Sequence, residues 1–172
     1  MLIDGIAPAG VIDDPLDHLR AEHERQRAVC DRLEHLLESM EVAALQPEAK
    51  GILDFLEVDL RHHIADEERD LFPRLAERAR PEDKLRPLLR QLSREHEMDE
   101  DLVDFLRADL QVLARGRDLA NPTRLLINLR EFAVTQRRHL DWEDETVLPL
   151  AEARLTPEDR HAMAESMRRR RA

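Results

Sequence analysis

Four histidines in this sequence stand where a long helix would otherwise present an apolar residue to its core. They interrupt runs of apolar side chains spaced by three or four residues: His23, His63, His96 and His139. His63 and His139 are each followed four residues later by a glutamate, Glu67 and Glu143 respectively, and this spacing places both side chains on one helix face. Imidazoles and carboxylates bind divalent transition metals, so these six residues are the candidate metal ligands.

Any one of these histidines, taken alone, is better explained as a hydrogen-bonded core residue than as a ligand. The set is different, because burying all six groups in one layer would cost several kcal/mol unless each found a partner. A pair of divalent ions supplies the missing charge. If both glutamates bridge, the side chains provide about eight bonds, whereas two octahedral ions need about twelve. The remaining positions would take solvent, an oxo or hydroxo bridge, or an exogenous ligand, which favours chemistry or sensing over a purely structural metal.

Prolines divide the chain into the elements that must position these residues, since proline is tolerated in the first helical turn and breaks a helix interior. The sequence predicts helices from Pro15 to about Met40 or Leu45, from Pro47 to Phe72, from Pro87 to about Gly116, from Pro122 to Pro149, and a short one after Thr156. In this scheme Pro73 and Pro149 end their helices. Each long helix carries one apolar seam with a period near 3.5 residues, which predicts an all-α, antiparallel up-down-up-down four-helix bundle with a short C-terminal helix. Beyond the glutamates the seam continues to Asp70 or Leu71, and to Thr146 or Val147.

The chain also repeats itself around the histidines. Glu22-His23-Glu24 recurs as Glu95-His96-Glu97, and His63-x-x-x-Glu67 and His139-x-x-x-Glu143 each have a proline ten residues after the histidine. At about 1.5 Å per residue, all four histidines fall at one level of an antiparallel bundle. The sequence therefore predicts two copies of one helical hairpin, with the site on a pseudo-twofold axis.

Other polar residues have weaker assignments. Gln26, Asp99 and Gln136 fall one turn deeper, where they would hydrogen-bond metal-bound solvent or ligand histidines, or form a polar layer without a function. His18 and His62 lie off their seams, which assigns them to the surface or to an outer layer around the site. The residues expected to be solvated are His35, His161, Glu22, Glu24, Glu95 and Glu97, and the Arg168–Arg171 run is expected to stabilise a helix C-terminus.

Composition excludes several classes of protein. The 172 residues are 42% apolar, enough for one core, and Asp plus Glu (38) exceed Lys plus Arg (27), which argues against a nucleic-acid partner. Four glycines, no tyrosine and 3% aromatic residues argue against a β-sandwich. The longest uncharged run is eight residues (5–12), against about 20 needed to span a membrane. A single cysteine, Cys30, and the absence of a signal-like N-terminus lead us to expect a cytoplasmic protein.

We expect three segments: a loose arm at residues 1–12, the bundle at residues 13–155, and a C-terminal helix with a basic tail at residues 156–172.

From Asp14 to about Leu155 the sequence resembles the hemerythrin-like, or HHE, cation-binding domains. The resemblance is carried by His62-His63-Ile64-Ala65-Asp66-Glu67-Glu68 with Leu71-Phe72-Pro73, and by His139-x-x-x-Glu143 with Leu148-Pro149. It implies a non-haem di-iron centre in a four-helix bundle, with His23, His63, Glu67, His96, His139 and Glu143 as ligands; manganese and zinc are less favoured. Oxygen-carrying hemerythrins have a further histidine where Glu100 stands and a bridging aspartate where Asp144 stands. The shared offset to proline favours Glu143 over Asp144, as in the bacterial di-iron repair proteins and eukaryotic iron sensors of this family.

Two functions follow as expectations. The first is a di-iron protein that binds dioxygen, nitric oxide or peroxide for sensing, storage or stress protection, and signalling would then require a partner or a homo-oligomer. The alternative is a di-iron oxidoreductase that consumes peroxide or nitric oxide, or an iron donor in repair of iron–sulfur clusters. A bundle in which the metal is only structural is the third and least favoured reading.

Overall fold

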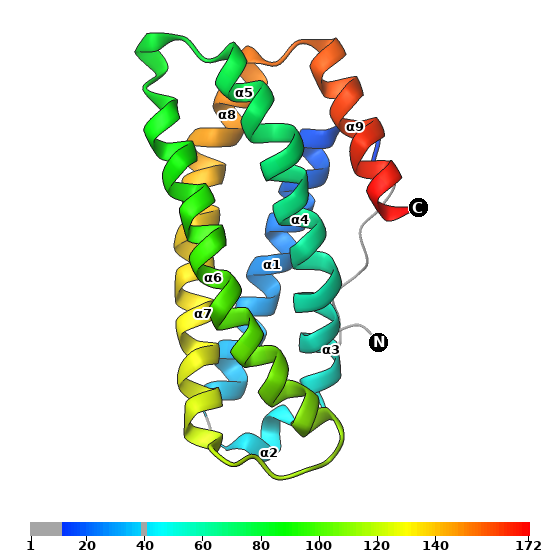
Figure 1. The fold of residues 1–172 in the computed structure, drawn as a ribbon, viewed down its shortest axis with the longest axis vertical. Helices are drawn as coiled ribbons and strands as arrows, with labels where there is room; N and C mark the ends of the chain where they lie inside the picture. The colour runs from blue at the N-terminus through cyan, green and yellow to red at the C-terminus, as the bar shows by residue number, and fades with distance from the viewer. Residues whose placement is uncertain (1–11, 39–40) are drawn as a thin grey trace.

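The structure is a computed structural model that describes residues 12–38 and 41–172, with the exception of the Asp99 side chain. Within these ranges all regular structure is helical (Figure 1). The α-helices are α1 (Pro15–Glu38), α2 (Val42–Leu45), α3 (Ala49–Asp54), α4 (Leu60–Asp66), α5 (Phe72–Arg78), α6 (Leu85–Ala114), α7 (Pro122–Trp142), α8 (Leu148–Arg154) and α9 (Pro157–Arg171). The shorter turns are the π-helices η1 (Phe55–Asp59), η2 (Glu67–Leu71) and η4 (Glu143–Val147), and the 3₁₀-helix η3 (Pro81–Asp83).

These elements form four antiparallel columns, as the sequence predicted (Figure 1). The columns are α1, the continuous run α3–η1–α4–η2–α5, α6, and the run α7–η4–α8. Helix α1 packs against α7, and α3 packs against α6. Helix α9 turns back along the outside of the bundle beside α1 and α4. No helix of the described residues is both long enough and apolar enough to cross a membrane.

Two separate apolar clusters fill the bundle. The lower core lies toward the α2 end of the bundle and the upper core toward the end formed by α5 and α8 (Figure 1). The lower core contains residues such as Leu33, Leu56 and Leu110, and the upper core contains Leu16 and Leu75 with many others. On each column the candidate ligands fall between the last residue of one cluster and the first of the other. The site is therefore a polar layer that separates two apolar cores, and the leucines on either side fix the four columns at its level.

The prediction that Pro73 and Pro149 end their helices is wrong. The chain remains helical through both prolines, to Arg78 and to Arg154. A π turn ends two residues before each proline, and the amide of Phe72 donates to the carbonyl of Glu67, five residues back. The wider turn relieves the clash that a proline ring otherwise makes with the carbonyl four residues earlier.

The two π turns also explain the spacing of the inward-facing side chains. In these segments buried residues recur every four positions, as in His63, Glu67, Leu71, Leu75 and in His139, Glu143, Val147, Ala151. Four residues of an α-helix rotate by about 400°, so each such step would carry the side chain about 40° away from the core. A π turn contains more residues than an α-helical turn, so each residue rotates less and the drift is cancelled. Of the two alternatives left open for each seam, Leu71 and Val147 are the ones in the apolar core.

Helix α9 is fixed at its start by a capping box, in which Thr156 and Asp159 each bond the other's backbone amide. Its Met163, Ala164 and Met167 are buried in the upper core. The upper core also includes Ile12, the one residue of the expected N-terminal arm within the described range, and residues 1–11 of that arm lie outside it. The short C-terminal helix predicted from the sequence is therefore part of the packed structure.

The end of α6 gives a first prediction. Gly116 has a φ of 66° and its amide bonds the carbonyl of Leu113, which makes it the helix-ending glycine expected from the sequence. An added Cβ would meet only Gln46 Nε2 at 3.4 Å, so the cost of Gly116→Ala comes from the backbone. We expect this variant to lower the free energy of unfolding by about 1 kcal/mol in urea denaturation. Gly116→Asn, which tolerates the left-handed region better, should lose less; equal losses would contradict the backbone explanation.

Candidate metal centre

The structure brings all six predicted ligand residues into one buried layer. The rings of His23 and His63 lie 5.0 Å apart between centroids, and those of His96 and His139 lie 4.6 Å apart. The side chains of Glu67 and Glu143 are at most 1% exposed. Each pair of histidines comes from two columns of the bundle, so the layer exists only when the columns are assembled.

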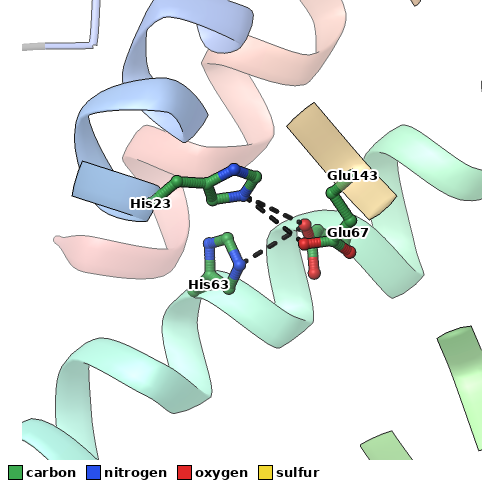
Figure 2. Close-up of side chains that lie close together, drawn as sticks. All are labelled: His23, His63, Glu67 and Glu143. Carbon is green, nitrogen blue, oxygen red and sulfur yellow. Dashed lines mark ion pairs between the residues drawn. The ribbon is translucent and has the colours of Figure 1, made fainter. Parts of the chain in front are cut away.

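Glu67 lies between the two histidine pairs. Its Oε1 is 3.3 Å from Nε2 of His63 and 3.7 Å from Nε2 of His23. Figure 2 marks both ion pairs. Its other oxygen, Oε2, is 3.4 Å from Nε2 of His96. One carboxylate thus presents one oxygen to each pair, which is the arrangement of a bridging ligand.

Glu143 occupies the equivalent position on the opposite column. Its Oε1 is 3.0 Å from Nε2 of His139, and its Oε2 is 3.6 Å from Nε2 of His23 (Figure 2). Two groups of four side chains result, and both contain the two glutamates: His23, His63, Glu67, Glu143 and His96, His139, Glu67, Glu143. In each group the ligand atoms lie within 4.8 Å of one another. The layer therefore offers two overlapping cation sites that share both carboxylates.

The atoms facing the centre of this layer fit a pair of divalent cations. Both oxygens of Glu67 and of Glu143, and Nε2 of His23, His63 and His139, are buried without a hydrogen-bond partner among the described residues. Buried polar atoms are rarely left unsatisfied. Two ligand atoms at about 2.1 Å from a shared ion lie about 3.0 to 3.4 Å apart for right-angled to tetrahedral geometry, close to the separations found here. Cations at these positions would satisfy every one of the orphaned atoms.

The other ring nitrogen of each histidine donates to a carboxylate on a neighbouring column. These outer carboxylates pair as His23 with Asp144 at 2.6 Å, His63 with Glu22 at 3.3 Å, His96 with Glu68 at 2.7 Å and His139 with Glu95 at 3.1 Å. A carboxylate can only accept, so it requires the proton on Nδ1 and leaves the Nε2 lone pair facing the glutamates. Such partners fix ring orientation and raise ligand basicity.

The expectation that Glu22 and Glu95 are solvated is therefore wrong, whereas Glu24 and Glu97 are exposed as expected. A residue adjacent to a seam histidine is rotated about 100° from it, so helix periodicity alone predicts that it faces solvent. In the bundle that direction points instead toward the next column. The sequence does contain an indication of their role, because the glutamate before His23 and the glutamate before His96 belong to the internal repeat.

Electrostatics in the layer favour charged imidazoles when no metal is bound. Burial lowers the pKa of His23, but its hydrogen bond to Asp144 and the charges of Glu67 and Glu143 outweigh burial and raise the pKa to about 10. Burial also lowers the pKa of His139, but the charge of Glu143 and its hydrogen bond outweigh burial and raise this pKa to about 9. Burial would raise the pKa of Glu143, but the neighbouring imidazoles hold it well below its ordinary value. Protons thus balance the buried carboxylates, and a metal ion must displace them.

The deeper polar residues meet only in part. Nε2 of Gln136 donates to Oε1 of Gln26 at 2.8 Å, and both side chains are buried. Asp99 lies on α6, and its side chain is outside the described part of the chain.

Of the remaining candidates, His35 and His161 are exposed as expected, and His62 is half-buried. His18 is buried with its Nε2 3.1 Å from Glu22, so it belongs to the outer layer and not to the surface. Glu100 is exposed and lies outside both groups of ligand atoms.

The expected role of the arginine run in stabilising a helix C-terminus is incomplete. Arg170 pairs with Asp66 and Asp70, and Arg171 pairs with Asp66 and Glu22. These two side chains therefore join α9 to α1 and to the α4–η2 run.

A cavity of about 460 Å³ lies beside the layer, between α4 and α6. Three of the histidines border it, His63, His96 and His139, together with Gln136. Its other walls include Leu60, Ile64 and Val103, and its exposed lining includes Arg61, Arg69 and Glu100. A small molecule could reach the layer from this side.

Comparison with models of known protein families identifies the family of this chain. The family model for the Hemerythrin HHE cation binding domain matches residues 14–151. Searches of curated proteins and of solved structures gave no match. The matched range contains all six residues of the layer and the outer carboxylates.

The geometry predicts which substitutions remove metal. His139→Ala should lose the ion held with His96, because that group would keep one nitrogen and the shared carboxylates. His35→Ala is the matched control, since His35 is 69% exposed on α1. We expect cobalt titration of the metal-free protein to give two ions per chain for the control and one or none for His139→Ala. Full cobalt binding by His139→Ala would contradict the assignment.

The raised histidine pKa values predict the pH dependence of stability without metal. The pKa values of His23 (about 10) and His139 (about 9) in the fold lie above the ordinary 6.5. Such groups stabilise the fold fully below the unfolded pKa, and the contribution is lost as pH rises through the folded pKa. In chelator, the free energy of unfolding should therefore fall above about pH 6.5, by about 1.4 kcal/mol per pH unit for each histidine. Urea denaturation of metal-loaded protein, where ions replace these protons, should not show this fall; a flat metal-free profile would contradict it.

Proposed function

This chain belongs to the hemerythrin HHE cation-binding family, and from that premise we propose that it is a non-haem di-iron protein that binds a small ligand. The ligand is dioxygen, nitric oxide or peroxide, and its binding serves sensing, storage or protection against stress. The observation that carries this proposal is the pair of overlapping His/Glu groups beside a cavity that three of their histidines border.

The donor set supports iron. Each group combines two imidazole nitrogens with carboxylate oxygens, and neither contains a thiolate. Such mixed nitrogen and oxygen sites suit iron or manganese, and carboxylates commonly bridge two ions inside helical bundles. Glu67 and Glu143 would bridge, and each histidine pair would complete one ion. When bound, two irons would supply open coordination positions and a reversible change of oxidation state.

The surrounding residues support binding of an exogenous ligand. The cavity would admit the ligand past Ile64 and Val103 to the edge of His96 and His139. Gln136 also borders the cavity, and its amide is held by Gln26. An amide nitrogen carries two hydrogens, so the Gln136 side chain would have one left for a ligand. Glu100, at the position of a histidine in oxygen carriers, lines the cavity instead, which favours nitric oxide or peroxide over oxygen transport.

A second candidate, a di-iron oxidoreductase that consumes peroxide or nitric oxide, is favoured by the size of the cavity. A volume of about 460 Å³ exceeds that of a diatomic molecule and would hold solvent as well, which turnover needs for proton delivery. Iron donation is less favoured, because four outer carboxylates fix the histidines and so favour retention of the metal.

The test is anaerobic loading of the metal-free protein with ferrous iron, followed by nitric oxide or peroxide. We expect two irons per chain by metal analysis and an optical change on ligand addition. A change that reverses when the ligand is removed supports binding, and sustained consumption of ligand supports the oxidoreductase.

Val103→Phe, which narrows the cavity, should slow the optical change several-fold and leave the iron content intact. Val134→Phe is its control, because Val134 is 57% exposed on α7 and does not line the cavity. A fully helical protein that takes up no iron would overturn the proposal, and equal ligand rates in both variants would exclude this cavity as the route.

A further inference from the structure

Glu22, the outer carboxylate of His63, is itself held from outside the bundle. Its Oε2 accepts from His63, while its Oε1 lies 2.9 Å from Arg171 and 3.1 Å from His18. Arg25 on the same helix is 3.3 Å away. Four side chains thus surround the Glu22 carboxylate and hold it in place against the His63 ring.

The arginine that reaches Glu22 comes from the last turn of α9. Arg171 lies 2.9 Å from Glu22 and 2.7 Å from Asp66, which is fully buried on α4. Arg170 pairs with the other oxygen of Asp66 and, at 2.7 Å, with Asp70. The end of α9 is therefore bound to the two columns, α1 and the α4–η2 run, that carry His23 and His63.

In the other half of the site, Glu68 accepts from Ser93 at 3.0 Å, but among the described residues no arginine of α9 pairs with an outer carboxylate. Glu95, the counterpart of Glu22, has a side chain that is 18% exposed, against 4% for Glu22. Gln91 bonds it at 3.4 Å in the place of His18, and the exposed Arg138 lies 3.5 Å away. The pseudo-twofold symmetry of the layer thus ends at its outer carboxylates, where only the His63 side is covered by α9.

His18, Glu22 and Asp66 also place ligand atoms within 4.8 Å of one another, which raises the question of a third cation. In this cluster the negative charge of the carboxylates is already balanced by arginine side chains. The carboxylates are Glu22, Asp66 and Asp70, and their arginine partners are Arg25, Arg74, Arg170 and Arg171. The cluster therefore anchors α9 and needs no metal.

We propose that Arg171, supported by Arg170, is a positioning residue for His63, so that the His23–His63 metal position is preorganised and fills before the His96–His139 position. The proposal rests on the two-metal site proposed above. Arg171 holds Glu22, Glu22 fixes the His63 ring, and a ring fixed before binding loses less freedom on binding.

The first test is stepwise cobalt titration of metal-free protein. Wild type should show two binding steps; His63→Ala should remove the tighter one and His139→Ala the weaker one. Loss of a direct outer partner costs about 10- to 100-fold in metal affinity, and Arg171 acts one contact further out, so Arg171→Ala should weaken the tighter step by about tenfold. The weaker step should not change, and Arg171→Lys should restore part of the loss.

Arg169→Ala is the matched control, since Arg169 is exposed in the same turn of α9. It should leave both steps unchanged. A general destabilisation of the bundle would weaken both steps together, so a selective effect separates positioning from a structural role. An unchanged tighter step in Arg171→Ala, or uptake of a third ion by that variant, would overturn the proposal while the two-metal site stands.

A second measurement uses the protein without metal, so that it holds even if wild type fails to bind two ions and the proposed function fails. The Nδ1 proton of His63, identified by its absence in His63→Ala, should be visible by NMR and exchange slowly with solvent. We expect Arg171→Ala to speed this exchange and Arg169→Ala to leave it unchanged. Equal exchange in both variants would overturn the positioning role.

Discussion

The structure depends on one electrostatic constraint, the burial of two carboxylates and four imidazoles at a single level of a helical bundle. Glu67 and Glu143 are fully buried, and such charges are tolerated only where positive charge replaces water. Protons on the imidazoles, or metal ions, supply that charge. The outer carboxylates occupy the Nδ1 atoms, so the Nε2 atoms face Glu67 and Glu143 before any ion binds. The outer carboxylates therefore set the orientation of the four imidazole rings.

The backbone adapts to this constraint at two equivalent places. The π turns η2 and η4 begin at Glu67 and Glu143 and bring side chains spaced by four residues onto one face. The same turns let the helices pass through Pro73 and Pro149 and continue into the upper core. Two apolar clusters above and below the polar layer then hold the four columns in register, so that packing keeps the six candidate ligands at one level.

Departures from symmetry give the two halves of the site different surroundings. The cavity lies between α4 and α6 and borders both histidines of one half, but only His63 of the other. Helix α9 covers the outside of the His63 half and connects it through Arg171 and Glu22 to the upper core. One half is therefore more open to a ligand and the other more firmly supported. A near-symmetric repeat can in this way provide two metal positions with different properties.

The helical class, the four columns and the six residues of the central layer were predictable from the sequence, because they follow from the period of apolar residues and the repeated His-x-x-x-Glu spacing. Other features of the site depend on how the columns pack. The sequence predicts a helix end at Pro73 because a straight α-helix cannot contain a proline in its interior. The π turn that accommodates it is stabilised by the two apolar cores on either side of the polar layer. Glu22 and Glu95 looked solvated because helix periodicity describes one helix at a time and not what the next column places beside it. The pairing of Arg171 with Glu22 joins residues 149 positions apart. Local spacing carries no information about such a contact, and only the packing of α9 against the bundle creates it.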